Sequence, residues 1–185
     1  MKCFEAPLPG VIVIEPAVHA DERGQFMEIW NAERYGAAGL NQPFVQDNVS
    51  VSKRDVVRGL HFQWPQPQGK LVSAVSGEIF DVAVDVRVGS PTFGQWAAFA
   101  LSATNGRQLY IPEGFAHGFA TMSECAVVVY KCTAVYCRST ERVLRWDDPA
   151  LGVDWPVREA ILSARDAAAP HLADIPTSAL PTFRA

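Results

Sequence analysis

The chain has 185 residues, 49% of them hydrophobic and 19% charged, which suits one globular domain with a sizeable core. Its net charge of -4 provides no basic surface for nucleic acid, so an anionic ligand needs locally placed Lys and Arg. The sequence also has no signal-peptide pattern, no bilayer-spanning apolar run and no C-x-x-C pair among its four cysteines. We therefore expect a cytoplasmic protein that has neither membrane nor nucleic acid as a partner.

Apolar and polar residues alternate with a period of two through most of the chain, which predicts strands. Turn-forming residues such as Asn105-Gly106 separate many of them. Helix is scarce: we expect one short helix over Asn31–Ala38 and another capped by Ser163, with Asp166 in its first turn. The expected strands are Val11–Glu15, Gln25–Trp30, Phe44–Ser52, Val56–Gln63, Lys70–Val75, Gly77–Val88, Trp96–Leu101, Arg107–Ile111, His117–Met122, Cys125–Tyr136 and Val143–Trp146.

The clearest strand is Gly77–Val88, whose strict alternation predicts a single buried face. Many short strands with few helices predict an all-β sandwich or barrel. Periodicity alone leaves an immunoglobulin-like sandwich and a jelly roll open, although no Cys…Trp…Cys framework supports the former. We expect one domain over residues 1–185, with its core at about 5–170 and a C-terminal tail at 171–185.

His61, within Val57-Arg58-Gly59-Leu60-His61-Phe62-Gln63, is the first candidate for chemistry, because imidazole titrates near neutrality and can abstract a proton. A hydrogen-bonded strand histidine is the plain alternative. Arg58 lies three residues earlier, so ideal alternation would put the two on opposite faces. Gly59 between them permits a bulge that re-aims one side chain, and Lys70 follows shortly.

Two tyrosines, Tyr130 and Tyr136, share one face of the expected strand Cys125–Tyr136, which otherwise carries small and apolar residues. A phenol with space beside its hydroxyl can act as a general acid. Alternatively, each ring packs in the core and bonds its hydroxyl to the backbone. The strand pattern by itself leaves both interpretations open.

Polar side chains also share faces on two other expected strands. Phe26 lies on the same face as Glu28, and Gln46 on the same face as Asn48 and Ser50. Polar residues in the middle of a strand indicate either a solvated face or the wall of a polar pocket, and the pattern is neutral between the two.

The segment Pro112-Glu113-Gly114-Phe115-Ala116-His117 has a P-x-G-x-x-H spacing that resembles the second conserved motif of cupins. In metal cupins such a histidine is a ligand. The first cupin motif normally supplies H-x-H and a downstream Glu, whereas the only histidines here are His19, His61, His117 and His171. A site of two histidines and one carboxylate is arithmetically possible, but we expect no metal.

An ordered set of motifs resembles the dTDP-4-dehydrorhamnose 3,5-epimerase family. Each string alone is a weak signal, whereas the set in family order, over about residues 5 to 170, is highly specific. The matching strings are Asp21-Glu22-Arg23-Gly24, Phe44-Val45-Gln46-Asp47-Asn48, Arg58-Gly59-Leu60-His61-Phe62-Gln63, Gln68-Gly69-Lys70-Leu71, Phe80-Asp81-Val82-Ala83-Val84-Asp85, Gly89-Ser90-Pro91-Thr92-Phe93-Gly94, Ile111-Pro112-Glu113-Gly114-Phe115-Ala116-His117-Gly118-Phe119 and Asp166-Ala167-Ala168-Ala169-Pro170.

This resemblance implies a homodimeric cupin-type β-jelly roll (a double-stranded β-helix) with short peripheral helices, and a cofactor-free epimerase acting on dTDP-4-keto-6-deoxyglucose. It implies His61 as the catalytic base, Asp166 as the group that orients it, and Tyr130 as the opposing acid. Lys70 would be the cation at the enolate oxygen. The Arg23–Glu28 strand would be lent to the neighbouring subunit's site. The implied substrate-binding residues are Arg23, Phe26, Glu28, Gln46, Asp47, Asn48, Arg58, Lys70, His117, Tyr136, Glu141 and Arg165.

Two small departures from the family pattern leave this set intact. Arg165 stands where Lys is common and Val135 where many members have Tyr, whereas the Tyr136 of dual-site members is present. The alternatives are an epimerase of C3 or C5 alone, a ketoisomerase of the same fold, a metal-dependent cupin and a non-catalytic sugar-binding jelly roll. A binding module would have no need for a His–Tyr–Asp–Lys set.

Overall fold

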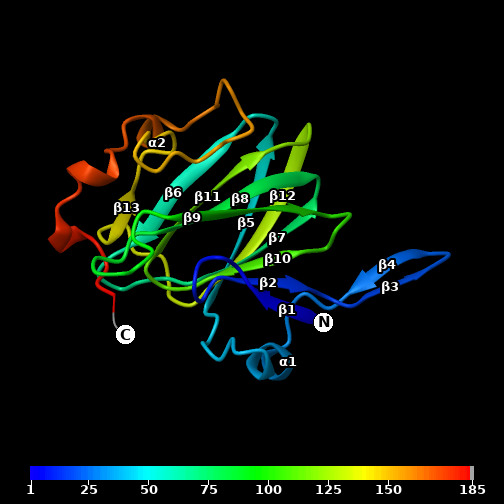
Figure 1. Cartoon of the computed structure of the whole chain (residues 1–185). Helices are drawn as coiled ribbons and strands as arrows, with labels where there is room; N and C mark the ends of the chain where they lie inside the picture. Colours follow the sequence, from blue (N-terminus) through cyan, green and yellow to red (C-terminus); the bar gives the residue numbers. More distant parts are fainter. Residues whose placement is uncertain (184–185) are drawn as a thin grey trace.

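The computed structural model describes residues 1–183, which form two large antiparallel sheets (Figure 1). The first has six strands in the order β1-β2-β10-β7-β12-β5, and the second has five in the order β13-β6-β11-β8-β9. The hairpin β3–β4 forms a separate two-stranded sheet. The strands are β1 Lys2–Glu5, β2 Ile12–Glu15, β3 Val18–Asp21, β4 Gly24–Met27, β5 Gln46–Lys53, β6 Val57–Gln63, β7 Lys70–Ser76, β8 Glu78–Asp85, β9 Trp96–Ser102, β10 Gln108–Ile111, β11 Phe115–Thr121, β12 Cys125–Cys132 and β13 Glu141–Val143.

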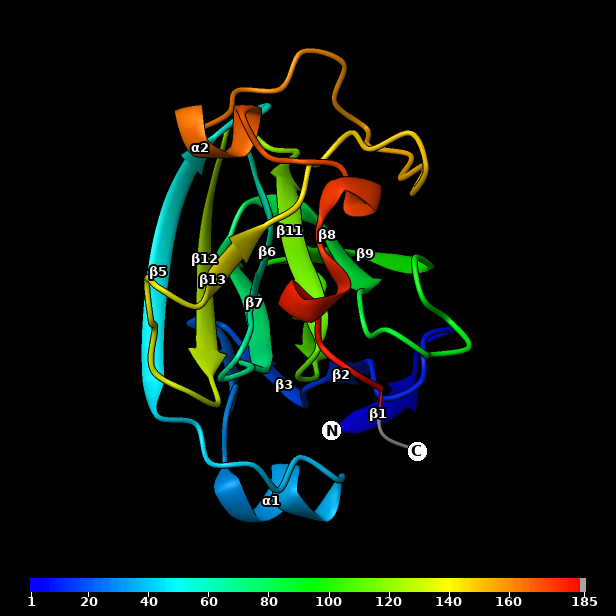
Figure 2. The same cartoon turned by 90° about the vertical axis from the view of Figure 1, so that its left-hand side faces the viewer.

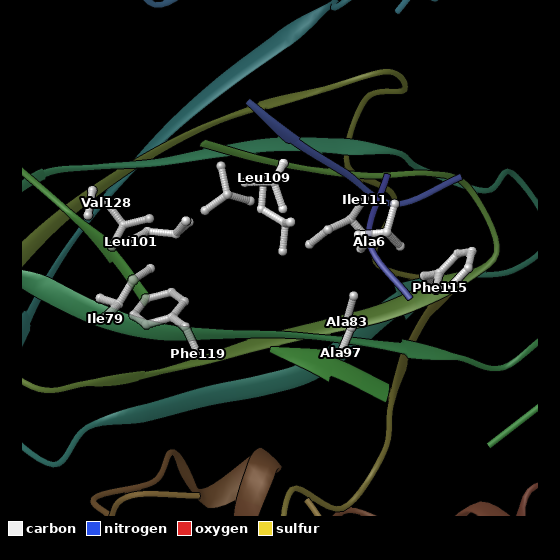
Figure 3. Close-up of a cluster of buried hydrophobic side chains, with 14 of the residues drawn as sticks. Ala6, Ile79, Ala83, Ala97, Leu101, Leu109, Ile111, Phe115, Phe119 and Val128 are labelled. Atoms are coloured by element: carbon white, nitrogen blue, oxygen red, sulfur yellow. The ribbon is translucent and has the colours of Figure 1, made fainter. Parts of the chain in front are cut away.

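The main core lies between the two large sheets, where apolar side chains from alternate strand positions meet (Figure 3). Leu109 and Ile111 of β10 belong to the same buried cluster as Ile79 and Ala83 of β8 and Phe119 of β11. Burying a large apolar side chain contributes about 1.5–3 kcal/mol, so this cluster holds the sheets together. The predicted all-β architecture with short helices is confirmed.

Strand β8 is buried on both faces, so the single buried face predicted for Gly77–Val88 is wrong. Ala83 faces the main core, whereas Val84 belongs to a second apolar cluster on the outer side of the sheet. Ile175 and Leu180 of the C-terminal segment pack in that second cluster. Figure 2 shows this segment crossing in front of β11 and β8. The valine face, which alternation marks as buried, is thus the one that this C-terminal segment covers. The face that alternation did not mark carries Asp81 and Ala83 and is also buried, with Ala83 in the main core.

Several strands end where their partners end. The predicted strand Cys125–Tyr136 stops at Cys132, which pairs with the first residue of β5, Gln46, and with the first residue of β7, Lys70. Beyond that point there is no neighbouring strand to pair with. Similarly, β4 and β13 are shorter than predicted, and β13 begins at Glu141 rather than at residue 143.

Two strands that alternation did not predict are β1 and β3. Every residue of both strands is exposed, so neither shows the alternating burial that a sequence pattern can record. β1 is an edge strand held by pairing with β2, and β3 is held by its hairpin partner β4.

Both predicted helices are confirmed. Asn31 caps α1, Ala32–Ala37, by accepting hydrogen bonds from two backbone amides, and Ser163 caps α2, Ala164–Ala167, by accepting from the Asp166 amide. Two 3₁₀ turns follow, η1 Leu172–Asp174 and η2 Thr177–Ala179. Within residues 1–183 no helix is long and apolar enough to cross a membrane.

A β-bulge in β6 puts Arg58 and His61 on the same cavity, as Gly59 between them suggested. His61 stands opposite His117 and Arg58 opposite Phe119, so two residues of β6 face one residue of β11. Gly59 has a φ of 134°, and a Cβ there would lie 2.5 Å from the Cα of Gly118. Only glycine fits this approach.

We expect Gly59→Ala to destabilise the protein by roughly 2–5 kcal/mol, from backbone strain together with overpacking against β11. Gly94→Ala is the matched control, because Gly94 also has a positive φ, 77°, but nothing lies within 4 Å of an added Cβ. That control should cost about 1–2 kcal/mol. Urea unfolding measures both losses, and equal losses would contradict a packing constraint at Gly59.

Candidate active site

A cavity of about 500 Å³ opens between the two large sheets, near α2. One wall comes from β5, β7 and β12 of the six-stranded sheet, and the other from β6, β11 and β13 of the five-stranded sheet. The lining residues are Gln46, Asn48, Ser50, Arg58, His61, Phe62, Gln63, Gln68, Lys70, His117, Phe119, Tyr130, Tyr136, Glu141, Ser163, Arg165 and Asp166. Residues from distant parts of the sequence thus converge on one polar site.

His61 and Asp166 form a close pair at the cavity wall. The Nε2 atom of His61 lies 2.7 Å from Oδ1 of Asp166. Burial alone would raise the pKa of Asp166, but the hydrogen bond and charge of His61 outweigh burial and hold that pKa below its ordinary value. The ionised carboxylate therefore orients the ring, and Nδ1 is the nitrogen left to accept a proton.

Lys70 and Tyr130 line the cavity from the six-stranded sheet. Burial lowers the pKa of the Lys70 ammonium, and Cys132, Asp81 and Glu141 partly oppose that shift. Burial also raises the pKa of the Tyr130 hydroxyl, with a smaller contribution from Cys132. Tyr130 therefore keeps its proton at neutral pH and can donate it. Among residues 1–183, the Tyr130 hydroxyl makes no hydrogen bond to backbone or side chain. A tyrosine that only packs in the core would be expected to bond its hydroxyl to the backbone.

A hydrogen-bonded chain crosses the mouth of the cavity. The Tyr136 hydroxyl donates to Glu141 at 2.9 Å, and Arg165 forms an ion pair with the same carboxylate. The Tyr136 amide donates to Gln46 Oε1 at 2.7 Å, and Gln46 Nε2 donates to Asn48 at 3.0 Å. These bonds join α2, β13 and β5, so the polar row on β5 is a pocket wall rather than a solvated face.

His117, like His61, is bonded to an aspartate of its own. Its Nε2 lies 2.8 Å from Oδ1 of Asp81 on β8, and both side chains are buried. Among the described residues, no group of three or more His, Cys, Asp or Glu side chains is arranged to hold a metal ion. The two cavity histidines are thus held by separate carboxylates.

Four of the predicted site residues lie outside this cavity. Arg23, Phe26 and Glu28 lie on or beside the β3–β4 hairpin, which projects from the body of the molecule (Figure 1). The Phe26 side chain there is 71% exposed. Asp47 points to the outer face of β5 and bonds Lys131 at 2.9 Å. The other eleven predicted site residues line the cavity together.

Residues 5–174 of this chain match the sequence model of the dTDP-4-dehydrorhamnose 3,5-epimerase family. The chain belongs to that family. The dTDP-4-dehydrorhamnose 3,5-epimerase of Salmonella typhimurium is 52% identical over 175 residues, which cover 93% of this chain and 96% of the relative. This bears out the resemblance carried by the ordered motifs.

Solved structures of the epimerase family share the fold closely. A Legionella pneumophila dTDP-6-deoxy-D-glucose-3,5-epimerase, in complex with dTDP-4-keto-L-rhamnose, is 48% identical and matches with a TM-score of 0.97, over 100% of this chain and 99% of the other. A 3'-monoepimerase from Streptomyces bikiniensis, in complex with dTDP-quinovose, is 36% identical with a TM-score of 0.87, over 96% and 93%. The cupin-type jelly roll predicted for this epimerase family member is confirmed.

Sequence reasoning missed some residues that the epimerase fold brings to the site. Ser50, Gln63 and Phe119 line the cavity, and Asp81 lies behind it. Ser50 was visible as a member of the polar row on β5. Asp81 had a signal as well, since a charged residue in the middle of a strongly apolar strand needs a partner when both strand faces are buried.

Proposed function

We propose that this chain inverts C3 and C5 of dTDP-4-dehydro-6-deoxy-D-glucose to give dTDP-4-dehydro-L-rhamnose. The observation that carries the proposal is the arrangement of His61 with Asp166 on one cavity wall and Tyr130 with Lys70 on strands of the other sheet. Relatives about 50% identical over most of their length bear this activity in their names. The chain is accordingly an isomerase that acts on a dTDP-sugar.

The chemistry follows from the acidity of hydrogens beside a ketone. His61 takes the proton from C3 or C5, and the electron pair of the broken C–H bond moves to O4 as an enolate. Lys70 stabilises the negative charge on O4, assisted by Arg58 or His117, because a charge that develops in a water-poor site is strongly stabilised by a fixed cation. Asp166 stabilises the imidazolium formed on His61.

Inversion then requires a proton from the other side of the sugar ring. Tyr130 donates its phenolic proton to the same carbon and O4 returns to a ketone. His61 then releases the proton it took to solvent, and Tyr130 regains one from solvent. A positioned acid or base typically contributes about 10²–10⁴-fold in rate. The same steps at the second carbon complete a dual epimerisation.

The nucleotide end of the substrate lies toward the cavity mouth in this proposal. Arg165 carries a positive charge for the diphosphate, and Arg23 from a neighbouring subunit supplies another. Gln46, Asn48 and Tyr136 supply hydrogen bonds and an aromatic surface for the sugar nucleotide. Asp47 points outward and bonds Lys131, so we assign its side chain no contact with the substrate in this cavity.

We further propose a homodimer in which each β3–β4 hairpin completes the partner's site. Three observations support it: the hairpin projects from the body, Phe26 on it is largely exposed, and neither Arg23 nor Glu28 reaches the cavity of its own chain. Val49 and Val51 on the outer face of β5 are 66% and 63% exposed in the single chain. Exposed apolar side chains of this kind suit a surface that a partner subunit covers. The four cysteines are free thiols, which fits a reducing cytoplasm.

Exhaustive chelation should leave epimerase activity unchanged, because each cavity histidine is bonded to a separate aspartate and no metal takes part in the proposed steps. Turnover is measured before and after dialysis against EDTA. A loss of activity that a divalent ion restores would sink the metal-free mechanism.

Tyr130→Phe should uncouple proton exchange from inversion. His61 can still remove a proton and return a solvent-derived one to the same face, so deuterium should enter C3 and C5. Inversion should fall by roughly 10²–10⁴-fold. NMR of the substrate in deuterated water measures both rates.

His61→Ala is the companion variant and should abolish exchange and inversion together. An exchange-to-inversion ratio in Tyr130→Phe equal to that of the unaltered enzyme would remove Tyr130 from the mechanism. Label at C3 alone in the unaltered enzyme would indicate a single-site epimerase, and label at neither carbon a binding module.

Inactive Glu28→Ala and His61→Ala variants should regain activity when mixed and allowed to exchange subunits. Each hybrid dimer then has one site with both lesions and one site with neither, so random exchange restores about a quarter of full activity. His61→Ala mixed with Asp166→Asn is the matched control and should gain nothing, because both residues lie on the same chain's site. Failure of the first mixture, despite proven exchange, would mean that one chain builds each site.

A further inference from the structure

Asp81 sits directly behind the cavity wall. It lies on β8 opposite Phe119 of β11, and its side chain is fully buried. One carboxylate oxygen, Oδ1, bonds Nε2 of His117 at 2.8 Å. Asp81 does not line the cavity, so any role in the reaction is exerted through a neighbour.

The second oxygen of this carboxylate is unpaired. Oδ2 of Asp81 is buried and has no hydrogen-bond partner among the described residues. An unsatisfied buried polar group costs about 1–3 kcal/mol, and more when it is charged. A carboxylate in this position therefore needs compensation from a nearby positive charge.

Lys70 is a buried cation that likewise lacks a directly bonded partner of opposite charge. Its side chain is buried, and its ammonium makes one hydrogen bond within residues 1–183, to the backbone oxygen of His61 at 3.3 Å. Burial is the main cause that lowers the pKa of Lys70, and the charge of Asp81 is among those that oppose this shift. Without a counter-charge the ammonium would lose its proton more readily.

The other groups near Lys70 that could carry a negative charge are uncharged or already paired. Glu141 bonds Arg165, and Asp166 bonds His61. Cys132 on β12, the cross-strand partner of Lys70, has a pKa raised by burial and so carries no charge at neutral pH. The full set of titratable groups around Lys70 is Arg58, His61, Asp81, His117, Tyr130, Cys132, Tyr136, Glu141, Arg165 and Asp166.

We propose that Asp81 is a positioning residue that supplies the buried counter-charge of Lys70 and thereby keeps the ammonium protonated for the enolate oxygen. His117 fixes the carboxylate through Oδ1 and leaves Oδ2 for this electrostatic role. The catalytic consequence rests on the proposed function, whereas the charge state of Lys70 can be measured without any substrate.

The test is a direct titration of Lys70 in the full-length protein. The chain has only four lysines, Lys2, Lys53, Lys70 and Lys131, so NMR of ¹³C-lysine-labelled protein can follow each ammonium, with Lys70→Met to assign its signal. Asp81→Asn removes the charge but keeps an oxygen that can accept from His117. The titration midpoint of Lys70 should fall by about 1–3 pH units.

Asp85→Asn is the matched control. Asp85 is fully buried on the same strand and the same face, but Arg87, Ser90 and Thr92 bond it instead. The Lys70 midpoint should stay unchanged in this variant. An unchanged midpoint in Asp81→Asn, or an equal fall in both variants, would overturn the proposal. If Asp81→Asn does not fold, the unaltered protein decides, because a Lys70 that is neutral at neutral pH would also overturn it.

Activity provides a second readout that a structural role would not move. The kcat/KM of Asp81→Asn relative to the unaltered enzyme should decline as pH rises, because more Lys70 is then deprotonated. A ratio independent of pH would assign Asp81 to the fold alone. If the unaltered chain epimerises no dTDP-4-keto sugar, the proposed function fails while the NMR titration still decides the role of Asp81.

Discussion

The close approach of β6 to β11 at Gly59 and Gly118 is the contact on which the site depends. It allows two residues of β6 to stand opposite one of β11, and this extra residue turns Arg58 and His61 toward the same cavity. In a regular strand, residues three apart point to opposite faces. One of the two would then leave the site for the outer side of the sheet, where the C-terminal segment packs. A backbone irregularity therefore decides which side chains can act together.

Charge pairing is the second constraint, because the cavity lies inside a protein core. An ionised group in such a place is stable only when it is paired or hydrogen-bonded. His61 has Asp166, Arg165 has Glu141, and His117 has Asp81. These pairs hold rings and guanidinium in fixed orientations before any substrate arrives, which is the condition for electrostatic stabilisation of a transition state. Lys70 differs from these groups, because its proposed counter-charge, Asp81, does not form a direct hydrogen bond with it. The charge state of Lys70 therefore depends most on its surroundings.

Much of the fold and site was predictable from the sequence, and the failures have physical causes. Alternation found most strands of the two large sheets, and Ser163 and Asn31 marked their helices by side-chain capping. The edge strand β1 and the hairpin strand β3 were missed because every residue in them is exposed. The second buried face of β8 was missed because Asp81 and Asp85 give it a polar pattern, although Ala83 on the same face lies in the main core. Asp81 was passed over for the same reason, since a charged residue in an alternating strand is typical of a solvated face and its partner His117 lies on another strand.

The two-sheet architecture suits inversion of a stereocentre for a geometric reason. Removing a proton from one face of the sugar carbon to give a planar enolate, and adding another proton to the opposite face, needs two groups on opposite sides of the sugar. A jelly roll provides these as facing walls, with His61 on β6 of one sheet and Tyr130 on β12 of the other. The fold alone does not set how many centres invert, because a 3'-monoepimerase matches this chain with a TM-score of 0.87. The difference must come from how the ring is held and turned between the walls. If Arg165 and Tyr136 hold the nucleotide as proposed, they therefore bear on stereochemistry as much as on affinity.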